Sequence, residues 1–140
     1  MGDSPKPATY NPDLEHLRLL TLFHKIIAGI YGFFGFCGFP HFTIGIVSMT
    51  NPSAFKSNAG QGPDAMFSWM FLAAGMSVIC FGWTLAVLNW LTANRLAQRR
   101  GVNLILVTEG LNCIWMPMGT ALGAFGFVVM TRPSVRALFS

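Results

Sequence analysis

The stretch from Asn103 to Arg136, NLILVTEGLNCIWMPMGTALGAFGFVVMTRPSVR, decides the fold, because its path determines how the rest of the chain is oriented. It is almost entirely apolar, yet Glu109 and Asn112 lie inside it, Pro117 interrupts it and two arginines end it. Each limb, 103–115 and 118–131, would be only about 20 Å long as a helix, whereas the hydrocarbon core of a bilayer is roughly 30 Å thick. The stretch therefore predicts two short tilted spans, a re-entrant hairpin or one kinked span.

Composition places the chain in a membrane. Of its 140 residues 53% are hydrophobic and only 10% are charged, against roughly 25% charged in an average soluble domain. We predict an all-α integral membrane bundle with about four transmembrane or half-membrane helices, whose first and last segments are broken at Pro40 and Pro117. Nucleic-acid binding is not expected, because the basic residues flank apolar segments instead of forming a patch with polar readers.

Local signals predict the first two membrane segments. Asn11-Pro12-Asp13 is typical of a helix start, and the apolar run 19–49 that follows is too long for one straight span. A second run, 66–91, carries no formal charge and should continue as a helix to Arg100, with Gly101 at its C-cap. We expect a flexible tail over 1–10, a loop over 51–64, one membrane domain over 11–136 and a short tail over 137–140.

The distribution of positive charge predicts the topology. The basic cluster Asn94–Arg100, NRLAQRR, should lie in the cytoplasm together with the N-terminus. The last two arginines also face the cytoplasm only if the chain turns back near residues 115–119, which the charge bias favours. The residues predicted to anchor the helices at the membrane surfaces are basic or tryptophan: Arg95, Arg99, Arg100, Arg132, Arg136, Trp69 and Trp90.

Glu109 is the only acid within an apolar run. A carboxylate buried in lipid costs at least about 2.5–3.5 kcal/mol, so this residue should face protein, water or the interface, or be protonated. One interpretation is a proton-coupled or ligand-binding group beside Thr108 and Asn112. The other is a residue that packs a helix junction, which its position about two turns from Asn103 favours.

The three histidines, His16, His24 and His41, raise the possibility of haem ligation. On one straight helix His24 and His41 would lie about 25 Å apart, so they could not hold one iron together. The weak candidates for binding a cofactor are therefore His24, His41 and Glu109. We predict no cofactor and no metal site, because the three cysteines are too widely spaced for a zinc or redox pair.

Glycines recur at helical spacing in two segments, Gly29, Gly32, Gly35 and Gly38 in the first and Gly119 and Gly123 in the last. Small residues let membrane helices approach closely, so these positions predict helix packing. A groove facing a partner, or one that accepts a flat pigment or quinone, is the alternative interpretation.

Several stretches together are similar to a known family. They are EHLRLL (15–20) with Phe23-His24, the basic turn NRLAQRR, and MPMGTALG (116–123) with RPSV (132–135). They resemble a family of small uncharacterised bacterial four-helix membrane proteins. The resemblance implies four segments and a bacterial inner-membrane location, and it implies no catalytic residues.

No metalloprotease, phosphate-loop or nucleophile-elbow pattern occurs, so we predict that the protein is not an enzyme. The leading hypothesis is a small accessory or structural membrane protein, a subunit or self-associating module whose partners are the bilayer and another protein or a second copy of itself. The alternative is a membrane binder of a ligand or cofactor such as a quinone, pigment or haem, or a transporter-like protein, using Glu109 and the proline breaks.

Overall fold

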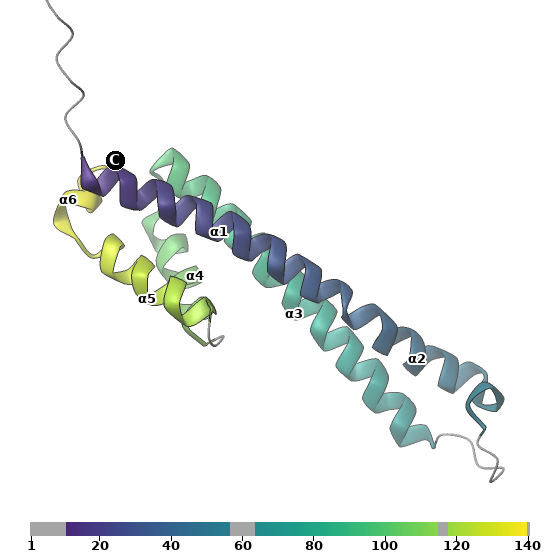
Figure 1. The fold of residues 1–140 in the computed structure, drawn as a ribbon. Helices are drawn as coiled ribbons and strands as arrows, with labels where there is room; N and C mark the ends of the chain where they lie inside the picture. Colours follow the sequence, from purple (N-terminus) through teal and green to yellow (C-terminus); the bar gives the residue numbers. More distant parts are fainter. Residues whose placement is uncertain (1–10, 57–63, 115–117, 140) are drawn as a thin grey trace, which may run out of the picture. The chain divides into compact units, whose positions relative to one another are not determined.

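The computed structural model describes residues 11–56, 64–114 and 118–139, and every regular element within these ranges is a helix. The all-α prediction is therefore confirmed for the described residues. In chain order the elements are α1 (Pro12–Phe36), α2 (Gly38–Thr50), the 3₁₀ turn η1 (Pro52–Phe55), α3 (Ala65–Gln98), α4 (Val102–Ile114), α5 (Met118–Met130) and α6 (Pro133–Arg136) (Figure 1). Part of the predicted loop 51–64 is thus the turn η1.

The first helix begins where the sequence predicts. The side chain of Asn11 accepts a hydrogen bond from the amide of Asp13 at 3.1 Å, and Pro12 is the first helical residue. The predicted break is also present, but it falls at Cys37, between α1 and α2. Pro40 cannot donate to the carbonyl of Phe36 and its ring crowds that carbonyl, so the ladder is interrupted one turn before the proline.

Helix α3 has one cap that the sequence analysis missed and one end that it misplaced. Asp64 caps the start, because its carboxylate accepts a hydrogen bond from the amide of Phe67 at 2.7 Å. The predicted end at Arg100 is wrong, since the helix ends at Gln98. The amide of Arg100 bonds to the Arg95 carbonyl at 3.0 Å, and Arg99 adopts a left-handed φ of 53°. This is the Schellman ending, with arginine at the position that glycine usually occupies.

The described chain divides into two compact units. Unit 1 combines the start of the chain to His24 with everything from Thr92 onwards, and unit 2 consists of Lys25–Leu91. Each long helix contributes to both, because the divisions fall inside α1 and α3.

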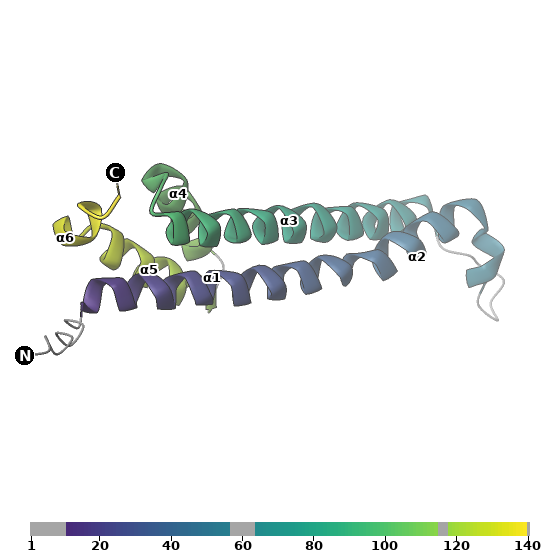
Figure 2. The same ribbon diagram turned by 90° about the horizontal axis from the view of Figure 1, so that it is seen from above.

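Unit 2 is a helical hairpin in which α1 and α2 run alongside α3 (Figure 2). Glycines bring the backbones together: a Cβ added to Gly38 would lie 2.7 Å from the Gly75 carbonyl oxygen, and one added to Gly45 would lie 2.6 Å from the Leu72 amide nitrogen. A Cβ on Gly75 would overlap the backbone of Phe42. Contact between these helices therefore depends on the absence of side chains at the crossing points.

Unit 1 contains a second, shorter hairpin made by α4 and α5. The two helices pack against each other in opposite directions, since Gly123 lies against Glu109 and Cys113 of α4 and Gly126 lies against Glu109. Trp115 and Pro117 lie outside the described residues, so the predicted break at Pro117 is not described. Each helix has 13 residues, about 20 Å of rise.

The C-terminal end of this hairpin lies against the N-terminal turns of α1 within the same unit. Arg132 contacts the carboxylate of Asp13 at 3.7 Å and the Nδ1 atom of His16 at 3.5 Å. The ring of His16 also meets that of Phe125 edge to face, with centroids 6.0 Å apart. The end of α5 is thereby attached to the first turns of the chain.

Two stretches of helix are long and apolar enough to span a membrane, Pro12–Thr50 taken across the break at Cys37 and Ala65–Gln98. Val102–Ile114 and Gly119–Met130 are apolar but shorter. Their 13- and 12-residue lengths do not reach across a core of roughly 30 Å without bilayer thinning.

Candidate functional site

A cluster of polar side chains fills the interior of unit 1. Its members are completely buried and come from three helices: His24 of α1, Thr92 of α3, and Thr108, Glu109 and Asn112 of α4. Thr108 and Glu109 are adjacent, and Asn112 follows about one turn later, so the three side chains lie on one side of α4. An interior with so many buried polar groups is the feature that most separates unit 1 from an ordinary apolar core.

The centre of this cluster is a contact between an imidazole and a carboxyl group. His24 Nε2 lies 3.4 Å from Glu109 Oε1, and both side chains are fully buried. His24 Nδ1 lies 3.0 Å from the Leu20 carbonyl oxygen. Because a carbonyl can only accept, Nδ1 carries a proton, and Nε2 is left facing the carboxyl group.

The contact defines a place for one proton. In the neutral form a protonated Glu109 donates towards Nε2, and in the ionised form an imidazolium faces a carboxylate; both forms carry the same net charge. At 3.4 Å this contact does not meet hydrogen-bond geometry, so His24 Nε2 and both carboxyl oxygens of Glu109 have no hydrogen-bond partner within the described residues. Buried polar atoms without partners are uncommon and costly, so this carboxyl group is held by its surroundings and not by a complete hydrogen-bond set.

Glycines of α5 create the space for Glu109. A Cβ added to Gly126 would overlap the carboxyl group, and one added to Gly123 would lie 2.5 Å from the Glu109 backbone oxygen. Gly126 was not among the predicted site residues, although its spacing of three from Gly123 places both on one face of the helix. The small-residue face of α5 therefore closes the site.

Hydroxyl groups connect the remaining helices around this pair. Thr92 Oγ1 bonds to Thr108 Oγ1 at 2.8 Å, which links α3 to α4. Thr108 donates in turn to the Leu104 carbonyl at 3.0 Å. Thr120 of α5 donates to the Cys113 carbonyl of α4 at 3.0 Å. Two of these bonds therefore link α4, which carries Glu109, to α3 and α5.

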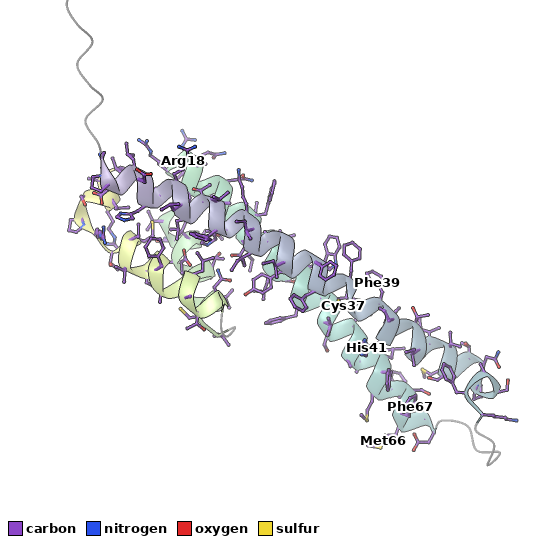
Figure 3. The ribbon with its side chains drawn as sticks, viewed as in Figure 1. Arg18, Cys37, Phe39, His41, Met66 and Phe67 are labelled. Atoms are coloured by element: carbon purple, nitrogen blue, oxygen red, sulfur yellow. The ribbon has the colours of Figure 1, made fainter. Side chains whose placement is uncertain are left out.

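The structure brings together two of the three weak cofactor candidates, His24 and Glu109, and leaves out the third. His41 lies in unit 2, where its Nδ1 is 3.2 Å from the Cys37 carbonyl oxygen and its ring stacks on Phe71 at 5.8 Å. Its side chain is exposed, and it is labelled in Figure 3. Across the described ranges no three His, Cys, Asp or Glu side chains are grouped so that they could hold a metal ion.

The predicted packing glycines have different surroundings. Gly35 lies directly against Trp83, and Gly38 lies against Gly75 and Ile79. A Cβ on Gly32 would make an ordinary contact of 3.9 Å with Ala86, and one on Gly29 would meet nothing within 4 Å. Gly119 and Gly123 are both buried in α5.

The predicted anchors lie at helix ends and on exposed faces. Trp69 and Trp90 of α3 are 58% and 54% exposed, and the side chains of Arg95, Arg99 and Arg100 are also exposed. Arg136 is engaged with the protein, since its Nε donates to the Met130 carbonyl at 3.2 Å. With Arg132 held by Asp13 and His16, the last two arginines are thus tied to unit 1.

The arrangement can hold a proton between two buried groups, and its apolar outer faces can contact lipid or protein. The imidazole and the carboxyl group come from helices that are distant in sequence, and only the fold brings them together. Comparisons with protein-family models, with curated proteins and with solved structures found no match.

Proposed function

We propose that this chain is a small integral membrane protein that acts without catalytic activity, as an accessory subunit or self-associating module. The observation that carries the proposal is its inverted polarity. Bulky apolar side chains such as Phe33 (68% exposed), Trp69 (58%) and Ile114 (75%) are on the outside, whereas His24 and Glu109 are fully buried. Phe39, Met66 and Phe67 also extend outward (Figure 3). A water-soluble protein rarely exposes so many bulky apolar side chains.

The long helix α3 supports a membrane location independently. Its most apolar window is only 17% buried inside the protein, so it does not behave as the core helix of a soluble fold. It also starts well inside the chain, unlike a signal sequence. Its length and mean hydropathy of 2.0 match a spanning helix.

The proposed topology places both termini on the cytoplasmic side of a bacterial inner membrane. The basic residues after α3 favour this side, and the α4–α5 hairpin returns the last two arginines to the end of the unit where α1 starts. The 3₁₀ turn η1, with Lys56 next to it, then faces outward. Each helix of the α4–α5 hairpin is short for a complete crossing, so four full spans require local thinning of the bilayer.

Extraction and labelling test location and topology. Membranes washed with alkaline carbonate should retain the protein, and release into the wash would contradict the membrane proposal. In a variant without native cysteines, Ser53→Cys should react with a membrane-impermeant maleimide on intact cells, whereas Ser134→Cys should react only after lysis. Labelling of both positions on intact cells would exclude the cytoplasmic C-terminus.

Assembly is tested on the protein purified in mild detergent. Native mass spectrometry should find a defined homo-oligomer or a stoichiometric protein partner. A monomer at micromolar concentration with no co-purifying protein would contradict the module proposal. A Soret or pigment absorption band in the same sample would instead support a cofactor binder.

A second candidate function, proton binding in a transporter-like protein, is favoured by the buried contact of His24 with Glu109. It predicts a proton-dependent signal in liposomes that Glu109→Gln abolishes while the melting temperature is retained. If the wild-type protein gives no such signal under a pH gradient, the pair has a packing role alone.

A further inference from the structure

A groove in unit 1 combines an apolar floor with a basic rim. It has a volume of about 250 Å³ and lies between the first turns of α1 and the last turn of α3. Leu14, Leu17 and Leu96 line the floor, and Arg18 and Arg99 are also among its lining residues. Leu17 and Leu96 are buried and Leu14 is 38% exposed, so the floor is open to a ligand on one side.

The two arginines of the groove are available for a ligand. Neither forms an ion pair or hydrogen bond through its side chain with any described residue, although Arg132 and Arg136 of the same unit both do. Of the acids at the start of α1, Asp13 is engaged by Arg132, and Glu15 forms no ion pair with a described cation. Arg18 extends outward from α1 (Figure 3). The rim is therefore positively charged and has no carboxylate bound to it.

The backbone at the end of α3 directs one particular arginine to this groove. Three arginines lie within six residues, but only Arg99 lines the groove. Arg95 lies over Gly101, with its Cδ 3.5 Å from where a Cβ would be. Arg99 keeps a left-handed φ of 53°, which glycine adopts without strain. An arginine at this position is locally unfavourable, so a role for its side chain would explain its presence.

The ends of α1 and α3 meet at this groove, and both belong to stretches long enough to span a membrane. Under the proposed function these ends lie near the headgroups of the cytoplasmic leaflet, where anionic lipids attract basic side chains. A ligand that uses the whole groove must carry a negative group for the arginines and a chain for the leucines. Free phosphate would make no contact with the leucines of the floor, and a lipid without net charge would gain little from the arginines of the rim.

We propose that this groove binds an anionic phospholipid, with its phosphate between Arg18 and Arg99 and an acyl chain along Leu14, Leu17 and Leu96. The inference rests on the proposed membrane location. Each arginine should raise the affinity for an anionic lipid about fivefold, so the two together give a preference of roughly 25-fold over a zwitterionic lipid at low salt. The preference decreases with ionic strength because part of the site is exposed.

The test uses the full chain in detergent with phosphatidylglycerol or phosphatidylcholine added, and native mass spectrometry counts retained lipids. Wild type should retain one phosphatidylglycerol with the higher affinity. Arg99→Gly removes the guanidinium while relieving the left-handed backbone, so lost affinity in this variant cannot be attributed to misfolding. Arg18→Gln should lose about as much, and the double variant should lose the preference. Arg100→Gln is the matched control, since it removes the same charge from the next residue but outside the groove.

Three results would overturn the site. Equal retention of the two lipids by wild type, or equal losses in Arg99→Gly and Arg100→Gln, would show that the groove does not select the headgroup. Displacement of the lipid by millimolar inorganic phosphate would indicate an anion site without a chain. Failure of the membrane proposal has a different signature, release of the protein by alkaline carbonate, so the two can be separated.

Discussion

The two units of this protein differ in the helix contacts on which they mainly depend. In unit 2, glycines let the backbones touch, as where Gly38 meets Gly75. In unit 1, polar side chains meet in the interior, as where His24 meets Glu109 and Thr92 meets Thr108. Unit 1 also has one glycine at a backbone contact, Gly123 against Glu109 and Cys113, whereas its Gly126 makes room for the Glu109 carboxyl group.

The difference shows how two kinds of contact fail. A backbone contact gains van der Waals energy over a wide area and tolerates no added atom, because the backbone, unlike a side chain, cannot change rotamer to make room. A polar contact tolerates small changes of shape, but it is costly when one partner is removed and the other stays buried. Unit 2 should therefore be sensitive mainly to enlargement, whereas unit 1 should be sensitive both to enlargement and to the loss of polar groups.

The largest effect is expected from Gly75→Ala in unit 2. Its Cβ would overlap the backbone of Phe42, so the helices must separate, at a cost of about 3 kcal/mol. The measurement is the free energy of unfolding in mixed micelles titrated with SDS. Gly29→Ala is the control, because its Cβ meets nothing within 4 Å, and it should stabilise the helix by about 0.5–1 kcal/mol. Equal effects of the two substitutions would contradict the close contact.

Gly126→Ala in unit 1 should cost about 2 kcal/mol, because the methyl group takes the space of the Glu109 carboxyl group. Adding Glu109→Ala should recover part of this loss, which a double-mutant cycle measures as coupling. Gly110→Ala serves as the comparison, since its Cβ would lie an ordinary 3.9 Å from Phe127. Strict additivity of the two changes would show that the side chains do not share this space.

The next largest loss of stability is expected when Glu109, the partner of His24, is replaced. Glu109→Leu leaves Nε2 buried without a polar neighbour and should cost about 1–3 kcal/mol, whereas Glu109→Gln can donate an amide hydrogen to Nε2 and should cost less than about 1 kcal/mol. The same SDS titration compares them. A glutamine variant as unstable as the leucine variant would indicate that the native pair is ionised.

The smallest effect is expected from the threonine bridge. Thr108→Val removes the bond to Thr92 while keeping the shape of the side chain, and hydrogen bonds between membrane helices average about 0.6 kcal/mol. Thr131→Val is the control, because the Thr131 hydroxyl is exposed and donates only to the nearby carbonyls of Phe127 and Val128 in α5. A cost above about 2 kcal/mol for Thr108→Val would show that the whole polar cluster depends on this bond.

Local features of the chain were predictable because their causes lie within a few residues. The start of α1 follows from Asn11 and Pro12, and the break before α2 follows from Pro40 removing a donor and crowding Phe36. The end of α3 was less predictable, because Gly101 is the obvious C-cap and does adopt a positive φ of 73°, yet the helix ends two residues earlier with Arg99 also left-handed.

The candidate site was only half predictable. Glu109 stands out in the sequence as an acid in an apolar run, and its cost of burial requires some partner. No pattern near it in the sequence indicates that His24 is that partner or that Gly126 makes room for the carboxyl group. Likewise, Gly29 and Gly38 belong to one regular glycine pattern, yet the first faces open space and the second touches another backbone.

The sequence by itself determined that the chain is helical and apolar and where its first helix starts and breaks, because hydropathy, proline and capping act over single turns. The charge bias favoured a chain that turns back but left its path open, and only the tertiary structure decided which faces of α4 and α5 meet, that Glu109 meets His24 and that Arg99 lines a groove with Arg18. These contacts join residues distant along the chain, and their energy arises from the packing of helix faces against one another.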